Sequence, residues 1–188
     1  PNLYFLIRRD IVILKILATT FGSFLPLNIG VGIGEIIDEF GKALFDEIDY
    51  EQEGKNALKF ADLFKSNPNV FIPKLEKDFS SKRVITTSWI DGVKLRDREI
   101  LEQNNLIPSS YIRTCVISGL QQLFEYGYFH ADPHPGNMFA LKGGTLDNGH
   151  LAYVDFGMMD TITNSDRLTL IKAIVHLINQ EYLLMAKD

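Results

Sequence analysis

The residues best suited to chemistry lie between Phe129 and Gly157. The segment 129–137 reads FHADPHPGN, in which Asp132 and Asn137 are five residues apart, and Asp155 follows eighteen residues after Asn137. Carboxylate and amide oxygens are the hard ligands that Mg²⁺ prefers in proteins. A further carboxylate could orient or deprotonate an attacking hydroxyl during phosphoryl transfer. We therefore predict Asn137 and Asp155 as metal ligands and Asp132 as the catalytic acidic residue.

The two histidines of this segment allow another interpretation, because the pattern His-x-Asp-x-His could ligate a transition metal. However, Pro133 and Pro135 flank His134, and the sequence has no further His or Cys cluster to complete a zinc shell. We expect His130 to hold the loop through hydrogen bonds and His134 to shape it.

Helices are expected before this segment. Leu6–Phe21 is an apolar helical run. Apolar side chains recur at helical spacing from about Ile33 to Phe64, which predicts one long helix or two in series. Asn67-Pro68-Asn69 ends this pattern.

Two β-rich runs follow, at 70–72 and at 83–90. The dipeptide Asp91-Gly92 is expected to form a turn that closes the second run. Pro108 opens a further helix that ends near Gly127 and whose apolar residues share one face: Ile112, Val116, Leu120, Leu123 and Phe124.

Strands are expected again at 138–141 and 151–154, on either side of a polar hairpin tip at 142–149. Thr163 and Asp166 form a capping box for a last helix, which should reach about Asn179. Helices, then strands, then helices around a small hairpin predict an α+β fold.

Composition limits the class of protein. The 188 residues suit about one globular domain with 46% hydrophobic residues, and a net charge of -5 argues against a nucleic-acid surface. Cys115 is the single cysteine, so no internal disulfide can form, and we expect an intracellular, reducing compartment. The start at Pro1 without Met predicts a fragment.

The uncharged stretch Ile16–Gly34 is as long as a membrane span, but its polar residues and glycines dilute the apolar content. We predict the end of one helix, a turn at 24–28 and the start of another helix. Peripheral contact with a membrane surface stays open.

Four motifs together resemble the UbiB family of atypical kinases. They are FHADPHPGN, the segment VDFG at 154–157, the acidic block EIDYEQEG at 47–54 with Asn56 beyond it, and WIDGVKL at 89–95. The resemblance runs in order from Pro1 to about Lys187.

The resemblance implies a protein-kinase-like fold with a truncated small lobe and a helical large lobe that carries a catalytic hairpin. Residues 1–188 would be a partial kinase domain, with the rest of the small lobe and inserted helices at about 1–90 and the large lobe at about 91–188. ATP and Mg²⁺ or Mn²⁺ would be the cofactors.

The resemblance also implies roles for single residues. Asp132 would be the catalytic-loop acid, Asn137 and Asp155 would bind metal and nucleotide, and Glu53 would pair with an ATP-contacting lysine of a small-lobe strand. The segment WIDGVKL resembles the family's hinge between the two lobes. Thr87, Ser88 and Trp89, at and just before its start, would contact the nucleotide.

Glu47 and Asp49 match the acidic pair that guards the pocket where a protein kinase would admit a peptide. Helix geometry predicts that Asp49 and Glu53, four residues apart, share a face, whereas Glu47 and Glu53, six residues apart, point well away from each other.

Several kinase features are missing from the sequence. It has no glycine-rich or alanine-rich nucleotide loop, no Val-Ala-x-Lys strand and no K-x-G-Q helix, all of which would lie before Pro1. Ala131 stands where protein kinases have arginine, and no Ala-Pro-Glu follows Asp155. We therefore expect this chain to be inactive alone and the whole protein to be a poor kinase of generic protein substrates.

The resemblance implies an ATP-dependent kinase or ATPase of isoprenoid quinone biosynthesis (ubiquinone or plastoquinone) or lipid metabolism, on the cytoplasmic side of a membrane. Its acceptor would be a small molecule or a lipid. A small-molecule phosphotransferase of the aminoglycoside or choline kinase kind and a non-catalytic nucleotide-binding scaffold remain alternatives. The acidic block at 47–54 favours the first reading.

Overall fold

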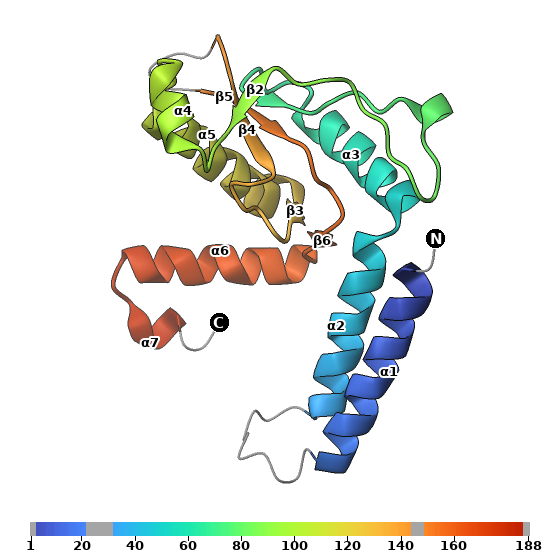
Figure 1. Ribbon diagram of the computed structural model, residues 1–188. Helices are drawn as coiled ribbons and strands as arrows, with labels where there is room; N and C mark the ends of the chain where they lie inside the picture. Colours follow the sequence, from blue (N-terminus) through green and yellow to red (C-terminus); the bar gives the residue numbers. More distant parts are fainter. Residues whose placement is uncertain (1–2, 22–31, 144–148, 186–188) are drawn as a thin grey trace.

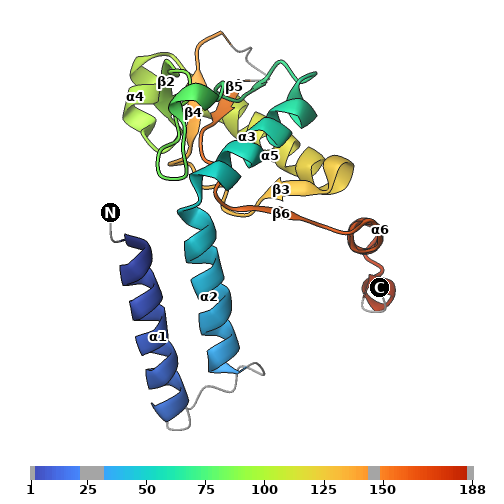
Figure 2. The ribbon, with the colours of Figure 1, turned by 90° about the vertical axis from the view of Figure 1, so that its right-hand side faces the viewer.

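The computed structural model describes residues 3–21, 32–143 and 149–185 and shows an α+β fold, as predicted (Figure 1). Helices α1 (Leu3–Phe21) and α2 (Ile33–Glu47) pack side by side and project from the body of the molecule (Figure 2). Gly41 allows their close approach, because a Cβ there would lie 3.0 Å from Ile11 Cδ1. The predicted turn at 24–28 lies outside the described residues, and no helix within them is long and apolar enough to cross a membrane.

Helix α3 (Tyr50–Phe64) follows α2 after a break, so the run from Ile33 to Phe64 forms two helices in series. The Asp49 side chain starts α3 by accepting a hydrogen bond from the Gln52 N–H at 3.2 Å. An N-cap of this kind satisfies a backbone donor that the first turn leaves unpaired.

A four-stranded sheet in the order β1-β5-β4-β2 forms the centre of the body. Strand β1 (Val70–Phe71) runs parallel to β5 (His150–Tyr153), and β5 runs antiparallel to β4 (Met138–Leu141). The strands predicted at 70–72, 138–141 and 151–154 are therefore present, give or take a residue at their ends. The tip between β4 and β5 falls largely on residues outside the description.

The strand predicted at 83–90 and the turn predicted at Asp91-Gly92 are wrong. This segment makes only isolated bridges, and the last strand of the sheet is instead β2 (Gly92–Lys94), paired antiparallel with β4. The β-branched and aromatic side chains have no sheet face to cover, since Trp89 is 92% exposed. Gly92 suits the edge position because a Cβ there would lie 2.8 Å from Leu141 Cδ2.

The short helices η2 (Lys77–Phe79) and α4 (Arg98–Gln103) flank β2, and α5 (Pro108–Gln121) follows. Helix α5 continues as a π-helical turn, η3 (Gln122–Tyr126), which ends at Gly127 with a left-handed φ of 63°. The end near Gly127 agrees with the prediction. Of the apolar residues predicted to share a face, Ile112, Val116 and Leu120 are exposed and Leu123 and Phe124 are half-buried, while Ser118 is fully buried.

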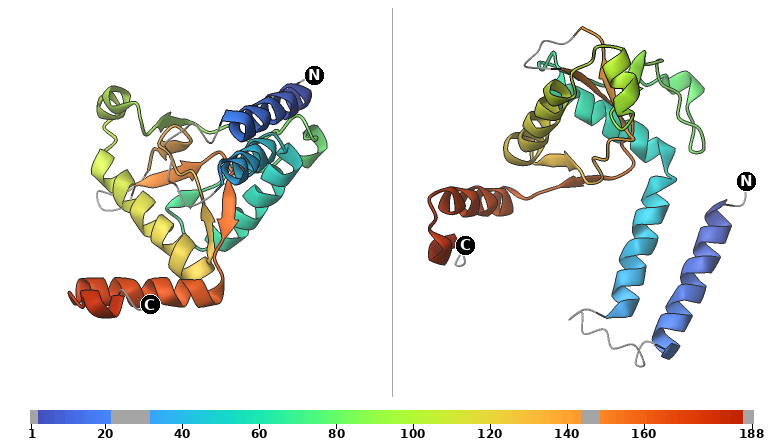
Figure 3. Two further views of the ribbon diagram at one scale, coloured as in Figure 1. Left: turned by 90° about the horizontal axis from the view of Figure 1, so that it is seen from below. Right: turned by 60° about the vertical axis from the view of Figure 1, so that its left-hand side comes forward.

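Strand β3 (Tyr128–His130) pairs with β6 (Met159–Thr161), and α6 (Asn164–Ile178) and α7 (Tyr182–Met185) extend away from the body (Figure 3). The predicted capping box is present, since Thr163 Oγ1 accepts the Asp166 N–H at 3.1 Å.

The main core lies where α3 meets the sheet. Phe60 and Phe64 of α3 stack at 4.7 Å between ring centroids, and Phe60 also contacts the rings of Tyr153 and Phe156 at 5.3 Å. All four side chains are at most 2% exposed. The residue after Asp155 is therefore part of the core, which fixes Asp155 at its edge.

Candidate active site

The loop after β3 is held by a buried histidine. His130 is 6% exposed, and its backbone N–H donates to Gln122 Oε1 at 2.9 Å. Its Nδ1 accepts the backbone N–H of Asp132 at 3.2 Å. Burial lowers the pKa of His130, which keeps the ring neutral and Nδ1 able to accept. Sequence patterns did not indicate Gln122, whose π-helical turn points its amide at the loop.

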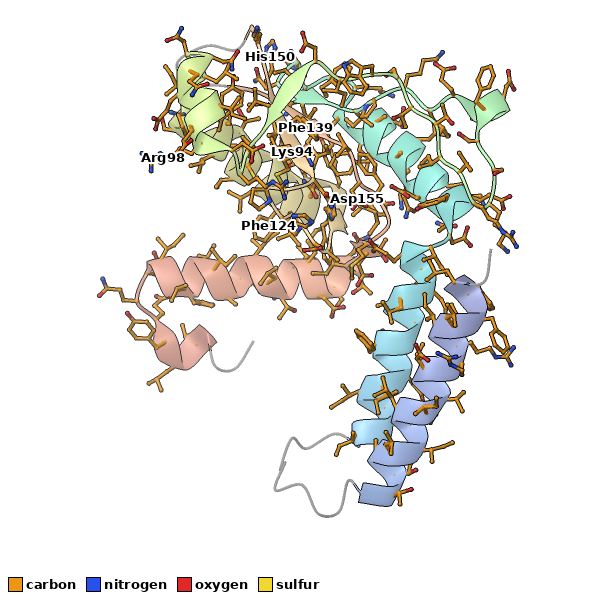
Figure 4. The ribbon with its side chains drawn as sticks, in the orientation of Figure 1. Lys94, Arg98, Phe124, Phe139, His150 and Asp155 are labelled. Carbon is orange, nitrogen blue, oxygen red and sulfur yellow. The ribbon has the colours of Figure 1, made fainter. Side chains whose placement is uncertain are left out.

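Asn137 and Asp155 meet at the end of the β4–β5 hairpin. The Asn137 Nδ2 donates to Asp155 Oδ2 at 2.5 Å, and the backbone N–H of Val154 donates to the Asn137 carbonyl at 3.2 Å. Asp155 Oδ1 also accepts the Gly157 N–H at 3.0 Å. Two residues eighteen apart in sequence are thus in direct contact, and Figure 4 shows Asp155 toward α3.

Side chains of helix α3 form hydrogen bonds with the backbone of Phe156, the residue that follows Asp155. Glu53 Oε1 accepts the Phe156 N–H at 3.4 Å, and Asn56 Nδ2 donates to the Phe156 carbonyl at 2.8 Å. Gln52 in turn donates to Asn56 Oδ1 at 3.0 Å. The position of α3 is therefore coupled to the position of Asp155. Sequence reasoning gave Asn56 no role, although it lies one helical turn from Glu53.

Glu47 and Glu53 reach the same site, contrary to the expectation for a continuous helix. Glu47 Oε2 lies 3.3 Å from the place of a Cβ on Gly157. The pKa of Glu47 is raised, first by burial and then by the negative charges of Asp155 and Asp132. The pKa of Glu53 is raised mainly by burial. The break between α2 and α3 turns Glu47 toward Glu53, while Asp49 caps α3.

Negative charge is concentrated here. Across residues 3–21, 32–143 and 149–185, none of Glu47, Glu53, Asp132 and Asp155 forms an ion pair with Lys or Arg. The nearest basic group is His134 Nε2, 3.9 Å from Asp132 Oδ2. Carboxylates this close repel one another, so a bound cation would stabilise them.

The donor set fits a hard divalent cation shared with a phosphate ligand. The described residues contain no group of three or more His, Cys, Asp or Glu that could hold a metal ion by themselves. Mg²⁺ commonly takes one or two protein carboxylates and completes its shell with phosphate oxygens and water. Asn137 and Asp155 offer an amide and a carboxylate for that arrangement.

Among the predicted hinge residues, Thr87 forms a bridge with Leu75, and Ser88 and Trp89 lie between that bridge and β2. The Ser88 hydroxyl accepts the Lys74 N–H at 2.9 Å, and the Ser88 N–H donates to the Lys74 carbonyl at 2.9 Å. Trp89 projects into solvent. Nucleotide contact by Thr87, Ser88 and Trp89 stays a prediction.

The whole chain is similar in sequence to known proteins. The profile of the ABC1 atypical kinase-like domain matches residues 1–188. The chain is 47% identical over its whole length to the uncharacterized protein slr1919 of Synechocystis. It is 36% identical over its whole length to the chloroplastic protein Activity of BC1 Complex Kinase 1 of Arabidopsis thaliana, and 28% identical over 97% of its length to the probable protein kinase UbiB of Aliivibrio salmonicida.

The chain covers 32%, 27% and 33% of these three relatives, respectively, so it spans about a third of their length. Its fold is also similar to Rv3197 of Mycobacterium tuberculosis, solved in complex with erythromycin, with a TM-score of 0.63. That match has 22% sequence identity and covers 96% of this chain and 44% of Rv3197.

Proposed function

Because this chain belongs to the family of ABC1 atypical kinase-like domains, we propose that it provides the metal site and catalytic loop of an ATP-dependent kinase or ATPase. Its fold is kinase-like and α+β, as the UbiB resemblance predicted. The activity is proposed for the whole protein, since the relatives extend well beyond the matched region.

The contact between Asn137 and Asp155 carries this proposal. An amide and a carboxylate meet beside three further carboxylates that have no Lys or Arg ion pair within the described chain. A Mg²⁺ or Mn²⁺ ion with the phosphates of ATP supplies the positive charge and the remaining ligands that such a site lacks. A purely structural loop would have no reason to gather unpaired acids.

Each residue then has a chemical task. Asn137 and Asp155 would hold the metal ion, which neutralises the phosphates. Asp132 would accept the proton of an attacking hydroxyl or water as the bond from that oxygen to the γ-phosphorus forms and ADP leaves. Glu53 would pair with a lysine from the rest of the domain, while its bond to Phe156 keeps Asp155 in place.

We propose a small-molecule or lipid acceptor, or water, rather than a protein. The Glu47 carboxylate lies beside Gly157, where it would oppose an acidic peptide, and Ala131 removes the arginine that reads activation-loop phosphorylation. The UbiB resemblance favours an acceptor of isoprenoid quinone or lipid metabolism. The proposal includes peripheral contact with a membrane, because apolar side chains on α1, including Leu14 and Leu17, are exposed.

Asp155→Asn in the whole protein tests the function. We expect a loss of at least about tenfold in Mg²⁺-dependent ATP affinity or turnover, because a charged metal ligand becomes neutral. ATP binding is measured by calorimetry at limiting Mg²⁺, and turnover is measured by ADP release. Asp78→Asn, on the exposed helix η2, is the matched control. Equal ATP affinity and turnover in Asp155→Asn and the control would contradict the metal assignment.

A further inference from the structure

Strand β2 leads the chain to the side of the catalytic loop. Its pairing with β4 places Lys94 opposite Phe139, and the Leu95 N–H extends the ladder by donating to the Met138 carbonyl at 3.0 Å. Figure 4 shows Lys94 beside Phe139, with Asp155 toward α3. The chain after β2 therefore passes directly alongside the segment that contains Asn137.

Arg96, two residues beyond Lys94, lies against this loop. Its Nη1 is 4.0 Å from the place that a Cβ on Gly136 would occupy. The His134 ring lies on the same glycine, since His134 Nδ1 accepts the Gly136 N–H at 3.1 Å and Nε2 is 3.9 Å from Asp132 Oδ2. Arg96 and His134 therefore both lie next to Gly136, and His134 also lies next to Asp132.

The guanidinium of Arg96 forms no ion pair with the described carboxylates of the acidic site. Within the described residues its ion pair is with its own neighbour, Asp97, at 3.5 Å, and its side chain is 61% exposed. Arginine presents planar N–H groups that bind phosphate or carboxylate in a bidentate manner. A guanidinium beside the loop would attract an anionic group of the acceptor, which the carboxylates of Asp132, Asp155 and Glu47 repel.

We propose that Arg96 is a specificity-determining residue that holds a phosphate or carboxylate group of the acceptor beside Asp132. The inference rests on the proposed function and narrows it to acceptors that carry an anionic group. That group could belong to a lipid headgroup or to a soluble small molecule, and the same guanidinium would bind either.

The test uses the whole protein loaded with Mg-ADP. The probes are glycerol 3-phosphate, with glycerol as its neutral control, and vesicles of phosphatidylglycerol in phosphatidylcholine, with pure phosphatidylcholine as theirs. Calorimetry measures the soluble probes and co-sedimentation measures the vesicles, for wild type, Arg96→Gln, Arg96→Lys and Arg98→Gln. Arg98 is the matched control because it is two residues away, 82% exposed and paired with Glu102 at 2.9 Å.

We expect wild type to prefer at least one anionic probe over its neutral control. Arg96→Gln should weaken binding of that probe by roughly tenfold or more, and by more than it weakens Mg-ADP binding, because charge-assisted hydrogen bonds are lost. Arg96→Lys should recover part of the loss, and Arg98→Gln should bind like wild type. The arm that responds, soluble or vesicle, identifies the source of the anionic group.

Three outcomes would overturn the role of Arg96. They are the absence of any anionic preference in wild type, equal losses in the Arg96 and Arg98 variants, and a loss confined to Mg-ADP affinity, which would make Arg96 a nucleotide contact. Failure of wild type to bind Mg-ADP would instead defeat the proposed function. The same titrations without nucleotide would then still measure anion binding by Arg96.

Discussion

Helices α2 and α3 are neighbours in sequence and both contain 15 residues, yet they hold very different positions in the molecule. Helix α3 buries Ala57, Phe60 and Phe64 in the core, whereas α2 buries only Gly41 among its described residues. Both contribute a carboxylate to one site, Glu53 from α3 and Glu47 from the end of α2. The comparison shows that a side chain can belong to the site without its helix belonging to the core.

The largest effect should follow a truncation in α3. Phe60→Ala removes a fully buried ring that contacts three other aromatic rings, so we expect the free energy of unfolding to fall by about 3–5 kcal/mol. Phe40→Ala in α2 removes a ring that is 53% exposed and should change it by at most about 1 kcal/mol. Urea denaturation measures both, and equal losses would mean that α2 is also part of the core.

A smaller effect is expected from the polar link between α3 and the site. Asn56→Ala leaves the buried Phe156 carbonyl without its donor, which should lower the free energy of unfolding by about 1–3 kcal/mol. It should also weaken Mg-ATP binding, because Asp155 precedes the released peptide. The control is Glu39→Ala, an exposed change in α2. If Asn56→Ala lowers stability but leaves Mg-ATP affinity unchanged, α3 supports the fold without positioning Asp155.

The smallest effect should be a difference in pH dependence. His130 is buried, and its folded pKa lies below the ordinary 6.5. As the pH falls below 6.5, the unfolded chain takes up a proton that folded His130 does not, so the free energy of unfolding should decrease. Glu47 and Glu53 act in the opposite direction, because their raised pKa values favour the folded state as the pH falls toward 4.5.

His130→Asn isolates the contribution of this histidine, because His134, His150 and His176 are present in both the variant and wild type. Urea midpoints at pH 7.5 and 5.5 should differ less in the variant than in wild type. An unchanged difference would assign the pH dependence to other groups.

Local sequence signals predicted much of the body. Thr163 and Asp166 marked the start of α6, and Gly127 marked the end of the helix before β3, because capping and left-handed backbone depend on a few adjacent residues. The hairpin of Asn137 and Asp155 was also predictable, because the two residues flank adjacent strands.

Other features depend on contacts between residues that are far apart in the sequence, which a local sequence pattern cannot predict. In α5 the apolar stripe is exposed, and the buried side chains are Tyr111 and the small polar residues Ser110, Thr114 and Ser118. Thr114 Oγ1 donates to the Gly149 carbonyl at 2.9 Å, and Ser118 Oγ shares a hydrogen bond with the Tyr153 hydroxyl at 2.8 Å. Likewise the β-rich run at 83–90 lacks a neighbouring strand, and the break after Glu47 redirects that side chain. The metal, nucleotide and gating roles of the site residues stay predictions.

The hydrogen bond from Asn56 to the Phe156 carbonyl joins residues 100 positions apart in the chain. A ribosome that adds roughly 5–20 residues per second would need about 5–20 s to reach Phe156 after it has made Asn56. During that interval the side chains of Phe60 and Phe64 have no finished core to enter. The same contact that couples α3 to Asp155 therefore forms only after Phe156 has been made, so the site cannot assemble before that point.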